Sequence, residues 1–389
     1  MNNIFIDASS RSLIKHGEEL CGDMVQAVKE NDDVIMVLAD GMGSGVKANI
    51  LATLTSKIIS TMVAKKMSIE DCVRTISATL PVCRVRNVAY STFTIIKITD
   101  GKYAQIIQYD NPKTILLRKG KNIEYPVITR LIDGKEITEA TIELQNDDVF
   151  IAMSDGVIYA GDEKILNYGW QRENVVEYIE SKYNYKLTAK EIGSIIIDAC
   201  NELYAQKPSD DTTVSVLQIR KRKSVNLIFG PSKNPEDDGK MLKEFFGKDG
   251  RRIVCGGTTA HIVASYLGED IENSAEELDP EIPPTSKIKG IDLVTEGIIT
   301  MSKVLNNIKD FNGENKLYKV WGKKKDGASQ ITRYLLEEAT DVSIFVGCAI
   351  NEAHHDTAFT ADIDIKLRIA KDIEKELKKL DKTVEVSYF

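Results

Sequence analysis

The sequence lacks most of the residues on which common catalytic mechanisms depend. It contains only four histidines and six cysteines in 389 residues, and no two cysteines form a Cys-x-x-Cys pair. Scattered cysteines favour reduced, buried thiols over a disulfide framework or a zinc site. None of them begins a Cys-x5-Arg sequence, which argues against a cysteine-dependent phosphatase. Only His16 lies in the first half of the chain, so a catalytic or metal site built on several histidines is not expected there.

Long apolar runs and an excess of positive charge are also missing. No stretch approaches the roughly 18 apolar residues needed to span a bilayer, and residues 1–7 lack the basic start and apolar core of a signal peptide. We therefore expect a cytoplasmic protein. The formal net charge of −8 argues against electrostatic binding to nucleic acid.

Hydrophobic patterning divides the chain into two parts. In residues 1–222, short β-branched runs separated by turns such as Asp100-Gly101 predict an antiparallel α+β domain covered by helices. In residues 223–389, strands and helices alternate, which predicts a smaller α/β domain with a Rossmann-like, mostly parallel sheet. Between them, Arg220–Ser224 is expected to be a solvated strand end and a linker.

The elements of the first part can be placed from their periodicity. Strands are expected at 34–39, 92–98, 103–109, 114–118, 149–153 and 213–219, and helices at 46–65, 68–80, 172–182 and 188–204. Helical spacing gives the helix at 46–65 a single apolar face, made of Ile50, Leu51, Leu54, Ile58, Ile59, Met62 and Val63.

The most informative feature is a set of aspartates beside apolar runs. They lie in Gly22-Asp23, Asp40-Gly41-Met42-Gly43-Ser44-Gly45, Ser154-Asp155-Gly156 and Asp210-Asp211-Thr212-Thr213. Each stretch alone is more often a turn, but several strand ends together make a cluster of hard oxygen ligands, which favours Mg²⁺ or Mn²⁺ over zinc. Two such ions about 3.5–4 Å apart activate water for attack on a phosphate ester without a protein nucleophile.

Taken in order, these stretches resemble the metal-dependent protein phosphatase superfamily, in its bacterial stage II sporulation protein E branch. Residues 90–93 and 147–157 match the same branch, so the resemblance covers about residues 1–220. It implies an α-β-β-α sandwich of antiparallel sheets flanked by helices. The site residues that it implies are catalytic Asp40, Asp155 and Asp210, and metal ligands Asp23, Asp40, Gly41, Asp155, Asp210 and Asp211.

The resemblance also implies roles for these residues. Asp40 would bridge two metal ions, the Gly41 carbonyl would ligate one of them, and Asp155 and Asp210 would complete the shell of the other. Asp23 would reach the first ion directly or through water, and Asp211 is an alternative to Asp210 one residue away. Met42 stands where many eukaryotic relatives carry a histidine thought to act as general acid. Leaving-group protonation would then come from water or the substrate's surroundings.

The implied substrate is phosphoserine or phosphothreonine on a regulatory protein, such as an anti-sigma-factor antagonist. The helices at 46–65 and 68–80 match the element through which the branch is switched, and ordinary core helices are the alternative.

In the second part, two stretches suggest ligand chemistry. Cys255–Ala260 lies between an expected strand and helix, where glycines and hydroxyls at a helix N-terminus can hold phosphate or carboxylate. We predict a small anionic ligand at Gly256, Gly257, Thr258 and Thr259, although a plain capped turn has the same pattern. The polar stretch Asn351–Asp356 is a metal-site candidate or a simple loop.

The sequence thus predicts a Mn²⁺- or Mg²⁺-dependent protein serine/threonine phosphatase with a C-terminal regulatory or ligand-binding domain. Two alternatives stay open at this point: a pseudo-phosphatase that binds a phosphoprotein without turnover, and a C-terminal domain that is itself a small-molecule enzyme. The expected partners are a phosphorylated regulatory protein and a small anionic ligand, with no nucleic acid and no membrane. A homodimer is also left open.

Overall fold

The computed structural model describes residues 4–30, 33–79, 91–162, 166–273, 283–313, 315–349 and 359–389. The chain divides into two compact units, Met1–Lys221 and Arg222–Phe389, each described here by itself. Tyr90 of the family pattern and the stretch 351–356 lie outside the described residues. In the part of the chain that is described, no helix is long and apolar enough to cross a membrane.

The N-terminal unit contains two antiparallel sheets. One has the strand order β1-β11-β10-β6-β7, and the other has the order β2-β3-β4-β5-β9-β8. The strands are β1 Ile4–Leu13, β2 Asp23–Glu30, β3 Asp33–Gly41, β4 Ser91–Thr99, β5 Tyr103–Tyr109, β6 Ile115–Arg118, β7 Lys121–Asn122, β8 Ile128–Ile132, β9 Lys135–Glu143, β10 Val149–Met153 and β11 Thr212–Lys221.

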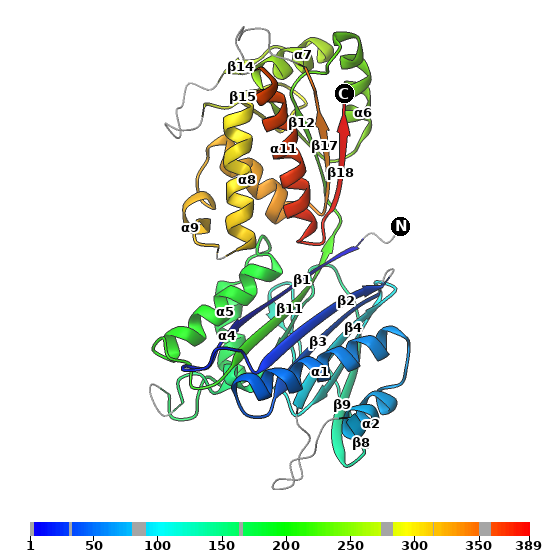
Figure 1. Cartoon of the computed structure of the whole chain (residues 1–389), viewed down its shortest axis with the longest axis vertical. Helices are drawn as coiled ribbons and strands as arrows, with labels where there is room; N and C mark the ends of the chain where they lie inside the picture. The colour runs from blue at the N-terminus through cyan, green and yellow to red at the C-terminus, as the bar shows by residue number, and fades with distance from the viewer. Residues whose placement is uncertain are drawn as a thin grey trace. The chain divides into compact units, whose positions relative to one another are not determined.

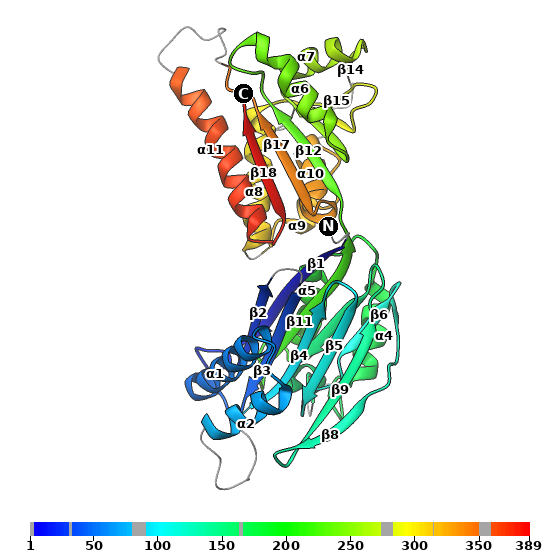
Figure 2. The same cartoon turned by 90° about the vertical axis from the view of Figure 1, so that its right-hand side faces the viewer.

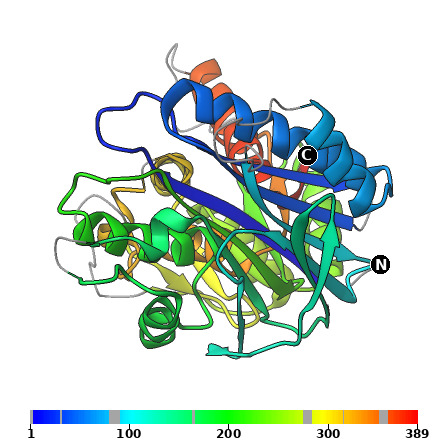
Figure 3. The same cartoon turned by 90° about the horizontal axis from the view of Figure 1, so that it is seen from below.

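Helices cover the outer face of each sheet (Figures 1 and 2). Apolar clusters join α1 and α2 to the six-stranded sheet and join α4 and α5 to the five-stranded one. A third cluster fills the space between the two sheets. Figure 3 shows α1 and α2 in blue and α4 and α5 in green on opposite sides. The helices are α1 Gly45–Ala64, α2 Ile69–Thr79, α3 Asp155–Ile158, α4 Arg172–Lys182 and α5 Ala189–Leu203.

This layering confirms the predicted α-β-β-α sandwich. It also explains why residues 34–39 are continuously apolar, because both faces of β3 are buried. Ile35 and Val37 pack toward α1, whereas Met36 and Leu38 pack between the sheets.

Five strands of this unit were not predicted, namely β1, β2, β7, β8 and β9. Each has exposed or half-buried residues at many positions, and β2 and β8 form the two edges of their sheet. Because one face or edge is open to solvent, polar residues interrupt the apolar pattern from which strands are recognised.

The predicted single apolar face of α1 is wrong in part. Ile50 and Leu54 are 52% and 43% exposed, and the buried face consists of Gly45, Ala48, Leu51, Ala52, Thr55, Ser56, Ile59, Ser60 and Val63. Small residues predominate there because α1 lies very close to β3. A Cβ added to Gly41 would come within 2.0 Å of the Ala48 carbonyl oxygen.

The C-terminal unit contains one sheet with the order β14-β15-β16-β13-β12-β17-β18. Within it, the neighbouring strands β16, β13, β12, β17 and β18 are parallel. The chain starts at the centre with β12, adds β13 and β16 on one side, and then adds β17 and β18 on the other. The strands are β12 Ser224–Phe229, β13 Arg251–Cys255, β14 Glu272–Asn273, β15 Ser286–Lys287, β16 Leu293–Thr295, β17 Asp341–Val346 and β18 Thr383–Tyr388.

Helices cover both faces of this sheet, as predicted for an α/β domain. Apolar residues of α6 and α7 pack on one face, and those of α8, α10 and α11 pack on the other; α6 lies across the strands from α8 and α11 in Figure 1. The helices are η1 Pro235–Asp237, α6 Asp238–Gly247, α7 Gly257–Leu267, α8 Ile298–Asn312, α9 Tyr318–Trp321, α10 Gly327–Arg333, the π-helical η2 Tyr334–Glu338, and α11 Phe359–Lys378.

A buried ion pair fixes the turn before β10. Asp148 is fully buried, and its two oxygens accept from Nε and Nη2 of Arg118, each at 2.8 Å. The Gln145 N–H also donates to Asp148 at 2.8 Å. The carboxylate therefore joins β6 to the start of β10.

Replacing Asp148 with Ala should lower the free energy of unfolding of the N-terminal unit by about 3–5 kcal/mol, because a partly buried Arg118 loses its partner. Urea unfolding followed by Trp170 fluorescence, in a Trp321→Phe background, measures the change. The control is Asp147→Asn, at an exposed position with φ of 66° that asparagine tolerates, with an expected change of about 0.5 kcal/mol or less. Equal losses in both variants would contradict the role of Asp148.

Candidate metal centre

The pairing of β2 with β3 places two of the predicted aspartates side by side. Asp23 begins β2 and is the register partner of Asp40 near the end of β3. The Gly41 N–H donates to the Gly22 carbonyl at 3.1 Å, and the Ser91 hydroxyl donates to the Asp40 carbonyl at 2.7 Å. Strand pairing and the Ser91 hydroxyl thus fix the strand ends without any contribution from the aspartate side chains.

The second sheet brings its own pair of strand ends together. Asp155 follows β10, and Asp210 and Asp211 precede β11, the antiparallel neighbour of β10. The Ser154 N–H donates to the Thr213 carbonyl at 3.0 Å, and the Thr213 N–H donates to the Ser154 hydroxyl at 2.8 Å. These bonds hold the ends of β10 and β11 beside each other.

The aspartates of the two sheets interact electrostatically, so the sheets place them at one site. Burial, followed by the charges of Asp23, Asp155 and Asp210, raises the pKa of Asp40 to about 10. Burial also raises the pKa of Asp155 and of Asp210, and each is raised further by a neighbouring carboxylate. The Asp155 side chain is also near enough to Asp40 to raise its pKa directly. With a pKa of about 10, Asp40 is protonated at neutral pH when no metal is bound.

Asp23 is deeply buried, with 4% exposure, as is Asp211. Burial raises its pKa to about 7, although the hydroxyls of Thr213 and Ser154 are near enough to oppose the shift. Neither of its carboxylate oxygens has a partner with hydrogen-bond geometry, and the same holds for Oδ2 of Asp211. Buried carboxylate oxygens without partners are unfavourable unless a proton or a cation compensates their charge.

These oxygen donors fit a hard divalent cation such as Mg²⁺ or Mn²⁺. Without a metal, a proton on Asp40, whose pKa is raised to about 10, would offset part of the charge that a cation would otherwise offset. Among the residues that the structure describes, no three His, Cys, Asp or Glu side chains are arranged to hold one ion as they stand. The carboxylates would therefore have to rotate in order to ligate a metal.

Two charged residues at this site were not predicted. Nζ of Lys15 lies 3.6 Å from Oδ1 of Asp210, and the Lys15 N–H donates to Oδ1 of Asp211 at 3.1 Å. Asp110 has a φ of 54°, and its charge raises the pKa of Asp155. The Lys15 contact spans about two hundred residues of sequence, so only the fold reveals it. Asp110 directly follows β5 and precedes Asn111-Pro112, a sequence that favours the end of a strand and does not indicate a metal ligand.

The predicted residues Gly256, Gly257, Thr258 and Thr259 belong to the other unit. They lie at the start of α7 and form a separate candidate site.

Without metal ions, the melting temperature should fall as the pH rises. An unfolded aspartate has a pKa of 3.8, whereas folded Asp23 has a pKa of about 7, so the folded state binds more protons between these values. This contribution to stability is complete below about pH 4 and is lost as the pH rises through about 7. Asp40, with a pKa of about 10, extends the decline further.

Circular-dichroism melts in EDTA across this pH range measure the effect. Asp23→Asn should flatten the decline between pH 4 and 7, because asparagine does not titrate. Asp133→Asn, at an exposed turn position, should leave it unchanged. A decline that is the same in wild type and Asp23→Asn would show that Asp23 does not titrate as stated.

Comparison with known proteins adds independent information on this unit. Residues 30–220 match the family model described as stage II sporulation protein E. A search of curated proteins gives no match. Among solved structures, the PP2C phosphatase domain with a fragment of the regulatory domain of SpoIIE from Bacillus subtilis is 17% identical, with a TM-score of 0.48. The match covers 56% of this chain and 63% of that chain, so this chain spans less than two thirds of it.

Two further structures contain metal ions. RsbX in complex with magnesium is 20% identical over 55% of this chain and 95% of its own, with a TM-score of 0.40. The catalytic domain of the serine/threonine phosphatase PstP in complex with two manganese ions is 17% identical over 56% of this chain and 100% of its own, with a TM-score of 0.38. The family model carries the comparison: residues 30–220 of this chain match stage II sporulation protein E.

Proposed function

We propose that the protein is a metal-dependent phosphatase that removes phosphate from phosphoserine or phosphothreonine on a regulatory protein. The observation that carries the proposal is the cluster of Asp23, Asp40, Asp155 and Asp210. Burial raises the pKa of all four at the joined strand ends of two sheets, and the charges of neighbouring carboxylates raise each one further. A fold that holds mutually repelling carboxylates together at this point in a PP2C-type domain supports a cation site.

Different residues of the cluster would ligate the two ions. Asp40 would bridge them, the Gly41 carbonyl would ligate one, and Asp155 and Asp210 would ligate the other. Asp23, whose two oxygens lack partners, and Asp211, whose Oδ2 lacks one, would complete the set. When bound, the ions supply activated water and offset the charge that develops on the phosphoryl oxygens.

Nearby side chains argue against a protein nucleophile. Cys21 lies beside the cluster, but burial and the charge of Asp23 raise the pKa of its thiol to about 12. The thiol is therefore not ionised at neutral pH and is a poor nucleophile. Met42, directly after Gly41, cannot donate a proton. Attack by water, with leaving-group protonation from water or the substrate, remains the chemistry that these residues support.

The proposal includes a regulatory phosphoprotein, such as an anti-sigma-factor antagonist, as substrate and a cytoplasmic location. The resemblance to the sporulation branch supports the choice of substrate. We also propose control through α1 and α2. Helix α1 begins at Gly45, close after Asp40, and exposes an apolar stripe of Val46, Ile50 and Leu54 at intervals of four residues.

Asp40→Asn should lower kcat/KM for a phosphoserine peptide with Mn²⁺ by on the order of 10²–10³-fold or more, because the bridging carboxylate is lost. The same should hold for para-nitrophenyl phosphate. The matched control, Asp133→Asn, should keep wild-type activity. EDTA should abolish the activity of the wild-type protein and of Asp133→Asn. Circular dichroism of Asp40→Asn should show an intact fold.

Wild-type protein that leaves both substrates intact in Mn²⁺ would refute the enzymatic proposal. If calorimetry then showed that it still binds Mn²⁺ and the phosphopeptide, the protein would be a pseudo-phosphatase. Full activity in Asp40→Asn would refute the bridging role alone.

A further inference from the structure

The carboxyl edge of the C-terminal sheet is the place where doubly wound α/β folds bind ligands. The loops after β13 and β16 meet there. The Gly256 N–H donates to the Thr295 carbonyl at 2.8 Å, and a Cβ on Gly297 would lie 3.6 Å from Cα of Gly256. These contacts bring the start of α7 close to Glu296. Helix α7 lies at the upper end of this unit in Figure 1.

The N-terminus of α7 has no cap of its own. Its N-cap residue is Gly256, with φ of 114°, and no side chain caps the helix or places an acidic group in the first turn. By contrast, Thr188 and Glu191 form a capping box on α5, and Asp326 caps α10. Since the first N–H groups of a helix have no partner within it, those of α7 are available to an anion.

Thr259 is an independent indication of a ligand. It is only 1% exposed, and its hydroxyl has no hydrogen-bond partner. The hydroxyl oxygen lies 3.1 Å from the point where a Cβ on Gly256 would be, so it is aimed at the vacant cap position. A ligand oxygen at this position would satisfy the hydroxyl together with the first N–H groups of α7.

Glu296 restricts the kind of anion that fits. It is exposed, and its two carboxylate oxygens lie 3.6 Å and 3.7 Å from the position of a Cβ on Gly257. No hydrogen bond joins it to the N–H groups of α7 among the described residues. A carboxylate at this distance repels a free phosphate ion but accepts hydrogen bonds from hydroxyl groups, as the acidic residue of dinucleotide-binding folds does with ribose.

From these contacts we propose that the α7 N-terminus, the Thr259 hydroxyl and Glu296 bind the ribose-phosphate portion of a small molecule. The phosphate lies at the helix N-terminus, and the ribose hydroxyls donate to Glu296. A nucleotide and a sugar phosphate share this chemistry.

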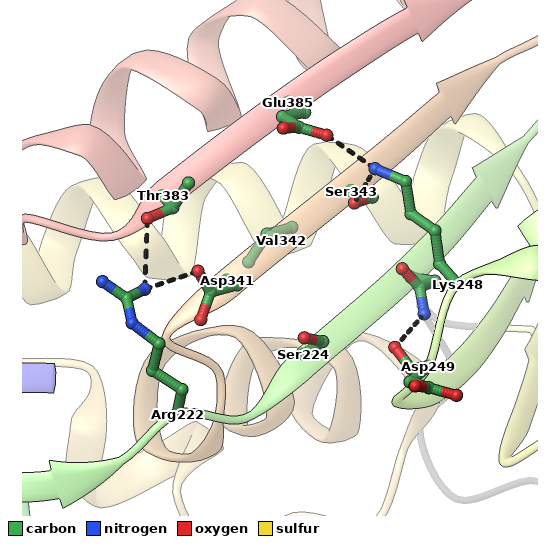
Figure 4. Close-up of a pocket in the computed structure, with 10 residues that line it drawn as sticks. Arg222, Ser224, Lys248, Asp249, Asp341, Val342, Ser343, Thr383 and Glu385 are labelled. Atoms are coloured by element: carbon green, nitrogen blue, oxygen red, sulfur yellow. Dashed lines mark hydrogen bonds and ion pairs between the residues drawn. The ribbon is translucent and has the colours of Figure 1, made fainter. Parts of the chain in front are cut away.

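The amino edge of the same sheet is a weaker place for an anion. A cavity of about 350 Å³ lies there, lined by polar residues of β12, β17 and β18 (Figure 4). Its two positively charged side chains are already in ion pairs. Nη1 of Arg222 lies 2.6 Å from Oδ1 of Asp341, and Nζ of Lys248 lies 2.6 Å from Oε2 of Glu385. An anionic ligand would have to break these pairs, whereas the donors at α7 have none to break.

Isothermal titration calorimetry on the full chain tests the proposal. The protein carries Asp40→Asn and is kept in EDTA, so that the metal centre neither binds ions nor consumes the probe. The probes are AMP, ribose 5-phosphate and inorganic phosphate. One molecule of AMP or ribose 5-phosphate should bind per chain and more tightly than inorganic phosphate. Binding of AMP alone would identify a nucleotide site, and equal binding of both would identify a sugar-phosphate site.

Two variants locate the site. Thr259→Val should weaken binding on the order of tenfold, because a hydrogen bond to the phosphate is lost. Glu296→Gln, at an exposed position, should remove the preference for ribose 5-phosphate over inorganic phosphate. The matched control is Thr300→Val, which removes a second buried hydroxyl without a partner from the same position of α8, and it should bind like the parent.

The proposal is overturned if neither AMP nor ribose 5-phosphate binds at millimolar concentration, or if Thr259→Val and Thr300→Val have equal effects. Inorganic phosphate binding as tightly as ribose 5-phosphate would exclude the assigned role of Glu296. Because the protein used is inactive as a phosphatase, none of these results depends on the proposed phosphatase activity.

Discussion

The repulsion among buried carboxylates is the constraint on which the N-terminal unit depends. Asp23 and Asp40 come from one sheet, and Asp155 and Asp210 come from the other, yet each affects the ionisation of at least one of the others. The sandwich can hold them because strand pairing fixes the chain on both sides of the cluster. β2 and β3 pair from Asp23 opposite Asp40 to Glu30 opposite Asp33, and β1 pairs with β11 along its full length. The apolar layers thus supply the stability that the charged edge lacks.

Much of this arrangement could be predicted from the sequence, for a physical reason. Strands β3, β4, β5 and β10 are buried on both faces or nearly so, and they appear as short apolar runs. Asp40 and Asp155 adjoin such runs, so their position at strand ends follows from the pattern. The strands with open faces, the true buried face of α1 and the contact of Lys15 with Asp210 depend on tertiary packing. The positive φ of Asp110 likewise has no signal in the surrounding residues.

Both units place polar groups at the ends of strands, but these groups favour ligands of opposite charge. The N-terminal unit gathers carboxylates, which favour cations. The C-terminal unit presents backbone N–H groups and a hydroxyl at the start of α7, which favour an anion, with Glu296 beside them. The residue type after each strand decides the difference: aspartate follows β10, whereas glycine follows β13. Glycine leaves the backbone donors uncovered, and aspartate adds acceptors.

The raised pKa of Asp40 has a consequence for how the centre would be loaded. A cation that enters must displace the proton on Asp40, and also the one on Asp23 when the pH is below its pKa. Metal uptake is therefore an exchange of protons for ions, so affinity rises with pH and binding acidifies an unbuffered solution. Under acidic conditions protons would compete with the metal for the same oxygens. The local proton concentration would then act as a competitor of Mg²⁺ or Mn²⁺, independently of any protein partner.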